Sequence, residues 1–275
     1  MLTEPTMERL RAMRLSAMAE GWATQQADAE LAALSFDERF ALLVEREFES
    51  RQNKKLTRAL REAKLKFPSA CVEDIDAGPG RGLDRAVLRQ LAQGRWAKEH
   101  HSIVITGKTG TGKTYLGCAY AQLACRLGMR ALYRRTSRLI DELNLARADG
   151  SFPRLIDRLA KIHVLFLDDW AMKPLNSQAR HDLLEIIDDR VGRGSTILAG
   201  QVPPDHWHDH FGDPTVADAI CDRLLHTAHQ LALTGPSRRG HTSSPSRAPT
   251  VGAPSTEGSS LRDDPSSASS PTVVP

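Results

Sequence analysis

Eight residues near the middle of the chain have the types and the spacing of a phosphate-binding loop. Residues 107–114, Gly-Lys-Thr-Gly-Thr-Gly-Lys-Thr, fit the Walker A pattern G-x-x-x-x-G-K-[ST] and directly follow the apolar run 102–106. Glycines allow the backbone to curl with its N–H groups pointing inward, and the dipole of a following helix adds positive potential. We therefore expect a nucleoside triphosphate to bind here. Its expected ligands are Gly107, Lys108, Thr109, Gly110, Thr111, Gly112, Lys113 and Thr114.

Two side chains of this loop have predicted roles of their own. Lys113 is expected to reach the β- and γ-phosphates, and the hydroxyl of Thr114 to bind Mg²⁺. The alternative is a glycine-rich turn with an exposed lysine. The β-branched strand before the loop and the helical pattern over 115–127 favour the phosphate site.

A second run, Val-Leu-Phe-Leu-Asp-Asp at 164–169, has the Walker B pattern of an apolar strand that ends in carboxylates. Asp168 is predicted to hold Mg²⁺ beside Lys113, through water. Asp169 is then placed to orient or deprotonate the attacking water, although its side chain is one methylene shorter than the Glu of many ATPases. Nucleotide binding is therefore better supported than fast turnover. Without the loop upstream, the same run would favour a surface turn.

Two further polar residues are candidates to meet the γ-phosphate. Gln201 follows the fourth predicted strand, where it is either a polar sensor or a solvent-facing residue before Pro203 and Pro204. Arg223 lies near the end of the last predicted helix, from which an arginine could reach the γ-phosphate of a neighbouring subunit. From spacing alone, a surface salt bridge is the favoured interpretation of Arg223.

The run His-Trp-His-Asp-His at 206–210 has residue types that bind metals, but prolines precede it and Gly-Asp-Pro follows it, which favours a loop. Neither Cys nor a further carboxylate stands at ligand spacing, so we predict no metal site there. The chain's four cysteines form no Cys-x-x-Cys pair, and Cys118 and Cys125 are predicted to be small core residues of the helix after the loop.

Apolar runs and helical patterns alternate through the second half of the chain. This order predicts crossover connections and an α/β fold, a five-stranded parallel sheet with helices on both faces. The predicted strands are 102–106, 131–133, 163–167, 195–198 and 231–234. The predicted helices that position the site between them are 137–148, 152–160, 176–191 and 215–227.

The first part of the chain differs in character. Residues 1–66 have helical periodicity, with a capping box at 35–38, and segment 51–66 carries basic side chains against Glu62 alone. A solvated helix face usually mixes signs, so the nearly uniform charge favours contact with a nucleic acid phosphate backbone, although the overall net charge of +3 demands no such partner. The basic residues are Arg51, Lys54, Lys55, Arg58, Arg61, Lys64 and Lys66.

These parts suggest an organisation for the 275 residues. We expect a helical DNA-engaging domain (1–67), a linker (68–101), a P-loop ATPase domain (102–235) and a disordered Ser/Pro-rich tail (236–275). The tail has no apolar period that could offset the entropy of ordering. No apolar run approaches a membrane span and the first residues lack a signal-peptide core, so we expect a cytoplasmic protein without membrane contact.

Taken together, these residues resemble the IstB-like ATP-binding family, the AAA+ helper ATPases of insertion-sequence transposition, which are related to bacterial helicase loaders. The likeness runs from about Glu8 to Gly235 and includes segments with no general ATPase meaning. These segments are 31–39, 41–47, 72–76, 81–85, 146–151, 167–170, 212–215 and 222–226.

The resemblance implies a helical N-terminal domain that engages DNA, an AAA+-type domain that binds ATP and Mg²⁺, a homo-oligomer on ATP and DNA, and a partner transposase. It also implies that Arg223 matches the arginine finger. The chain departs from the family at Ala199 and Gly200, where Thr-Ser is usual, and in its Ser/Pro tail. A helicase loader, a non-hydrolysing assembly adaptor and, third, a P-loop kinase of small molecules remain alternatives.

Overall fold

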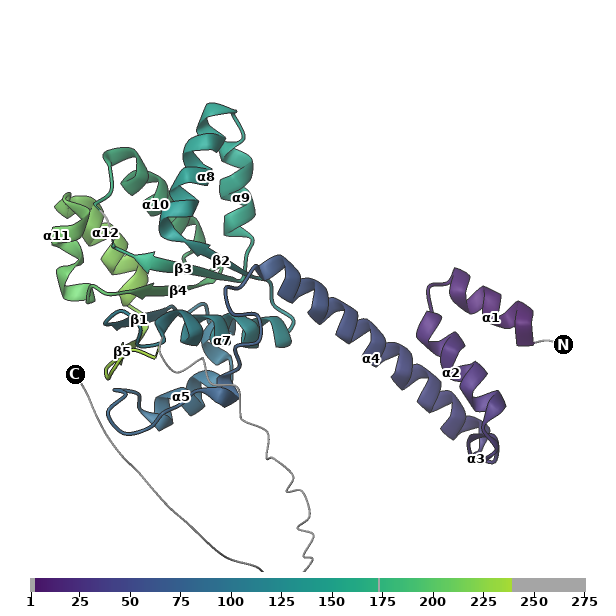
Figure 1. Ribbon diagram of the computed structural model, residues 1–275. Helices are drawn as coiled ribbons and strands as arrows, with labels where there is room; N and C mark the ends of the chain where they lie inside the picture. The colour runs from purple at the N-terminus through teal and green to yellow at the C-terminus, as the bar shows by residue number, and fades with distance from the viewer. Residues whose placement is uncertain (1–2, 173, 239–275) are drawn as a thin grey trace, which may run out of the picture. The chain divides into compact units, whose positions relative to one another are not determined.

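A five-stranded parallel sheet forms the centre of the computed structural model, which describes residues 3–172 and 174–238 (Figure 1). Its strands are β1 (Ile103–Gly107), β2 (Ala131–Arg135), β3 (Val164–Trp170), β4 (Ser195–Gly200) and β5 (His229–Leu233). They lie in the order β2-β3-β4-β1-β5, and every adjacent pair is parallel. The expected fold class is confirmed. Because β4 is the central strand and β3 and β1 lie on either side of it in parallel, the carboxyl ends of β1 and β3 meet at one edge of the sheet.

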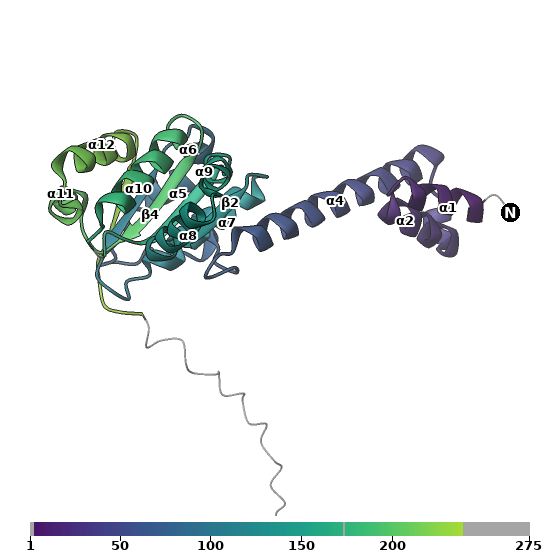
Figure 2. The same ribbon diagram turned by 90° about the horizontal axis from the view of Figure 1, so that it is seen from above.

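Helices cover both faces of this sheet, as the alternating apolar strands require. Ile103 and Ile105 of β1 belong to the core under α5 (Arg85–Ala92) and α7 (Lys113–Arg126). Val104 faces the opposite core, which contains the helices α8, α9, α10 and α12 (Figures 1 and 2). Those helices are Thr136–Ala148, Phe152–Ala160, Ser177–Arg190 and Pro214–Leu225. Cys118 and Cys125 of α7 are buried, as predicted.

The first part of the chain is helical, as expected: α1 (Thr3–Ala12), α2 (Ser16–Ala27), α3 (Ala29–Ala32) and the long α4 (Phe36–Ala63). The predicted capping box is present, since Ser35 and Glu38 exchange hydrogen bonds at the start of α4. The backbone N–H of Met18 donates to the buried carboxylate of Glu47 at 3.1 Å, which joins α2 to α4.

The end of α4 packs against the sheet's own core. Leu56, Ala59 and Leu60 contact the cluster that contains Ala63 and the helix α7. Burial of these side chains continues the apolar core into the helical region. The division at residue 67 that the sequence suggests stays a prediction, and the predicted tail lies outside the described residues from 239 onward.

One segment predicted to be a loop is a helix. Residues 207–211 form α11 (Trp207–Phe211), preceded by the 3-10 turn η2 (Pro204–His206). Trp207 and Phe211 stand four residues apart, so they share one helix face, and both rings pack against Trp170 with centroids 5.7 and 5.8 Å away. Gly212, with φ 63°, ends the helix. The flanking proline and glycine were therefore helix boundaries.

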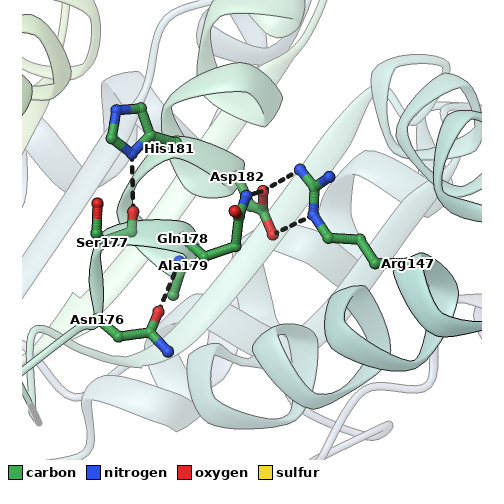
Figure 3. Close-up of polar contacts among 7 residues, drawn as sticks. All are labelled: Arg147, Asn176, Ser177, Gln178, Ala179, His181 and Asp182. Carbon is green, nitrogen blue, oxygen red and sulfur yellow. Dashed lines mark hydrogen bonds and ion pairs between the residues drawn. The ribbon is translucent and has the colours of Figure 1, made fainter.

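A buried carboxylate holds two of the sheet-covering helices together (Figure 3). Asp182 on α10 is 1% exposed, and it accepts from the guanidinium of Arg147 on α8 and, at 2.8 Å, from the amide of Gln178. The same guanidinium lies 3.7 Å from the centre of the Phe152 ring at the start of α9. This network fixes α8 and α9 against α10.

The short helix α6 (Arg95–Lys98) and the 3-10 turn η1 (Val72–Asp74) complete the elements of the described residues. In residues 3–172 and 174–238, every helix falls short of the length or the hydropathy that spanning a lipid bilayer requires.

Candidate nucleotide-binding site

The loop between β1 and α7 has the backbone that its glycines predict. Gly107, Gly110 and Gly112 have φ values of 144°, 86° and 98°, a region that side-chain-bearing residues rarely adopt. At Gly107 a side chain is also excluded by space, because a Cβ there would lie 2.4 Å from the carbonyl oxygen of Leu233. Gly112 is the residue before α7, so the N–H groups of the loop lie next to those at the N-terminus of this helix.

The ammonium group of Lys113 lies inside the curve of this loop. It donates to the carbonyl oxygens of Gly107 and Lys108, both at 2.8 Å. Thr111, which is 1% exposed, closes the same turn by donating from Oγ1 to the Lys108 oxygen at 2.9 Å. The loop therefore presents a cation together with oriented backbone amides, the combination that binds phosphates.

The two predicted metal ligands meet across the sheet edge. Thr114 Oγ1 on α7 lies 3.2 and 3.0 Å from the two carboxylate oxygens of Asp168 on β3. Asp168 is 2% exposed, and the hydroxyl of Tyr133 on β2 also donates to it, at 3.0 Å. Hydroxyl and carboxylate oxygens are the hard donors that Mg²⁺ prefers, and a site with few protein ligands leaves positions for phosphate oxygens and water. The residues therefore fit the metal that the motif implies.

Asp169 lies in a distorted part of β3. The strand predicted to end at Leu167 continues to Trp170, and its register shifts between Asp168 and Trp170. Asp169 has φ 56°, which a short polar side chain tolerates better than most. Because of this bulge, its side chain is 45% exposed while that of its neighbour is buried, and it lies 3.7 Å from Nε of Arg135. Adjacent carboxylates thus occupy different environments and are suited to different work.

Comparison with known proteins agrees with this geometry. The sequence profile described as IstB-like ATP binding protein matches residues 8–246. The chain belongs to this family. Two relatives, both insertion sequence ATP-binding proteins, come from Sinorhizobium fredii and Pseudomonas fluorescens. The first is 46% identical over 87% of this chain and 97% of the relative. The second is 48% identical over 74% of this chain and 88% of the relative.

Two solved structures share the fold of this family member over most of their own length. A crystal structure of the DnaC helicase loader is 20% identical, with a TM-score of 0.53, and covers 60% of this chain and 97% of that one. A crystal structure of DnaI is 22% identical, with a TM-score of 0.52, and covers 62% of this chain and 91% of that one. At these identities the likeness concerns the fold.

Within the described residues, no hydrogen bond joins the other two candidate residues of this IstB-like chain to Thr114 or Asp168. Gln201 is exposed and directly follows β4, which lies between β3 and β1 at the same sheet edge. Arg223 on α12 pairs with Asp188 on α10 at 2.5 Å and donates to the carbonyl of Ala219 on its own helix. A salt bridge is therefore its role within one chain, while a role in a neighbouring subunit stays a prediction.

Two residues of β2 belong to the site although the Walker A and Walker B motifs do not identify them. Tyr133 donates to Asp168, and Arg135 lies beside Asp169. Burial, and then the charge of Asp168, raise the pKa of Tyr133, so its hydroxyl keeps its proton and remains a donor. The parallel pairing of β2 with β3 sets Arg135 opposite Asp168. Once β2 is known to neighbour β3, that pairing identifies both residues.

Proposed function

We propose that this IstB-like chain is an ATP-binding, DNA-binding ATPase that acts as the helper of an insertion-sequence transposase. The observation that carries the proposal is the arrangement of Lys113, Thr114 and Asp168, the parts needed to hold a triphosphate with Mg²⁺. Family membership supports the association with transposition, since the relatives are insertion sequence ATP-binding proteins.

Each residue of the site has work to do in hydrolysis. Lys113 lies where it would exchange the loop's carbonyl oxygens for the β- and γ-phosphates, since an ammonium prefers charged oxygens. Mg²⁺, held by Thr114 and Asp168, would supply neutralisation of phosphate charge. Asp169 is exposed enough to meet water, and it orients or deprotonates the nucleophile. Gln201 contacts the γ-phosphate in this proposal.

We place Arg223 in a neighbouring copy's site. It is only 32% exposed at its side chain and pairs with Asp188, so reaching another subunit requires that ion pair to open. Exposed pairs of this kind are worth about 0–1 kcal/mol, which binding of a polyphosphate offsets. The proposal therefore includes a homo-oligomer that ATP and DNA assemble.

DNA contact is assigned to the basic segment 51–66. Arg58 is paired with Glu62 at 2.7 Å and Arg51 with Glu47 at 2.8 Å, so two of the cations already have anionic partners. Lys54 and Arg61 line a groove of about 660 Å³ between α2 and α4, and Lys55 lines a second, of about 380 Å³, beside Arg130. Cations from one helix thus face two grooves.

A salt titration tests the DNA assignment. Each phosphate neutralised contributes a slope of about −0.9 to log K against log[salt], so Lys55→Ala/Arg58→Ala/Arg61→Ala should lower the slope by roughly two to three for every DNA sequence. A matched variant loses three exposed arginines of the sheet-covering helices. It carries Arg138→Ala, Arg154→Ala and Arg158→Ala. If the first variant keeps the full slope, or if both lose the same, segment 51–66 is not the DNA contact.

The protein that this chain binds distinguishes a transposition helper from a helicase loader. A tagged chain loaded with ATP should retain the transposase encoded beside its own gene and should not retain a replicative helicase. Retention of the helicase alone would favour a helicase loader. Single-turnover hydrolysis with DNA present addresses the adaptor alternative, since an adaptor that uses ATP only for assembly leaves the γ-phosphate uncleaved.

A further inference from the structure

Hydrogen bonds join the linker before the sheet to Thr234, the residue that follows β5. The N–H of Thr234 donates to the carbonyl of Arg81 at 3.0 Å, and its Oγ1 donates to that of Gly80 at 2.6 Å. The approach is close, because a Cβ on Gly82 would lie 2.4 Å from the Ala232 oxygen. Contacts with β5 and Thr234 therefore hold the loop 76–82 in place, although these two parts of the chain are far apart in sequence.

The residues after β5 continue directly over the Walker A loop. The N–H of Arg238 donates to the carbonyl of Gly110 at 2.9 Å, and a Cβ on Gly110 would lie 2.1 Å from Oγ of Ser237. The guanidinium of Arg238 forms an ion pair with Asp76 of the linker. The linker and the residues after β5 thus make a clasp, residues 76–82 and 234–238, beside the phosphate loop.

Within this clasp Arg81 is the side chain nearest the start of α7. Its terminal nitrogen lies 3.5 Å from the position of a Cβ on Gly112. Its Nε is buried and has no hydrogen-bond partner among the described residues. The carboxylate in its vicinity, Asp76, is occupied by Arg238 and by the N–H of Gly78. Burial, and then the charge of Arg238, lower the pKa of Arg81. The clasp contains two arginines, Arg81 and Arg238, against the single carboxylate of Asp76, so it has an excess of positive charge.

We propose that Arg81 is a nucleotide-binding residue that contacts the α- and β-phosphates. The inference rests on the proposed function of the Walker A loop as a nucleotide site. Arg81 lies at the loop's last glycine, where the backbone cradles the α- and β-phosphates, whereas Lys113 reaches the β- and γ-phosphates. A phosphate oxygen satisfies the buried Nε–H with a charge-assisted hydrogen bond. The clasp keeps the arginine beside the loop, so little ordering is required on binding.

The position of the contact gives a test that depends on the number of phosphates. Fluorescent ATP and ADP analogues are titrated, with Mg²⁺, into the full chain and into Arg81→Gln. We expect the variant to bind both nucleotides about ten- to a hundredfold more weakly, by the same factor, because both carry the α- and β-phosphates. Arg81→Lys should recover part of the affinity. The matched control is Arg89→Gln, an exposed arginine on α5, and it should bind like the parent.

Three results would overturn the inference. If Arg81→Gln binds both nucleotides as tightly as the parent, Arg81 does not contact the phosphates, although the nucleotide site itself stands. A loss confined to ATP places Arg81 at the γ-phosphate instead. A melting midpoint of nucleotide-free Arg81→Gln well below that of Arg89→Gln, with no recovery of affinity in Arg81→Lys, makes the residue structural. If the parent chain binds neither nucleotide, the proposed function fails, which is a separate outcome.

Discussion

Replacing Asp169 with Asn separates nucleotide binding from hydrolysis. The substitution keeps the size of the side chain but removes the charge that would accept a proton. Asn tolerates the left-handed backbone as well as Asp does, so the φ of 56° remains accessible. Neither Thr114 nor Asp168 is touched, so the proposed Mg²⁺ ligands stay in place.

The structure sets the size of each effect. The ion pair lost with Arg135 is 3.7 Å long between side chains 49% and 45% exposed, so its removal changes the free energy of unfolding by at most about 1 kcal/mol. Affinity for ATP should stay within about twofold of the parent, because the lost ion pair is worth so little and the proposed phosphate and Mg²⁺ ligands are unchanged. Loss of a general base lowers the rate of the chemical step by about 10²- to 10⁴-fold.

Single-turnover phosphate release, measured with DNA present, gives the rate, and titration of a fluorescent ATP analogue gives the affinity. Asp168→Asn is the matched variant: it also removes one carboxylate, but it should weaken Mg²⁺-dependent binding. If Asp169→Asn hydrolyses at the parental rate, the base lies elsewhere and the role assigned to Asp169 is wrong.

Two further predictions concern stability. Arg147→Ala leaves the buried carboxylate of Asp182 without its cation and should lower the free energy of unfolding by about 1–3 kcal/mol in denaturant titrations. The control Arg138→Ala removes one partner of an exposed pair and should lower it by almost nothing. Equal losses in the two variants would contradict the role of the Arg147–Asp182 pair drawn in Figure 3. Burial, and then His101, lower the pKa of His229 below its ordinary value of 6.5, so the folded state resists protonation and stability is lost as pH falls through that range. The melting midpoint of the parent should therefore drop more between pH 7.5 and 5.5 than that of His229→Gln, and parallel curves would refute the assignment.

The sheet could be predicted because its strands contain short apolar runs between clear helical patterns. Helix α9 begins and ends where its periodicity indicates, at Phe152 and Ala160. The loop's glycines predict their positive φ angles, since that conformation has few alternatives to Gly. These are local properties, and local sequence determines them.

The parts that could not be predicted depend on tertiary contacts. The bulge at Asp169 arises from the pairing of β3 with β4, and helix α11 is stabilised by burial of Trp207 and Phe211 on Trp170. Tyr133 joins the site only because β2 neighbours β3. Arg81 reaches the Walker A loop through pairing of the linker with residues after β5, more than a hundred positions away in sequence, and no short motif records such a pairing.

Titration of a fluorescent ATP analogue into Lys113→Ala measures whether the loop at 107–114 binds ATP through Lys113. Loss of a charge-assisted donor to a phosphate costs about 1.5–3 kcal/mol, so affinity should fall by about ten- to a hundredfold. Lys98→Ala, which removes an equal charge from the exposed end of α6, should bind like the parent. Equal affinity of the parent and Lys113→Ala would contradict the assignment of the nucleotide site.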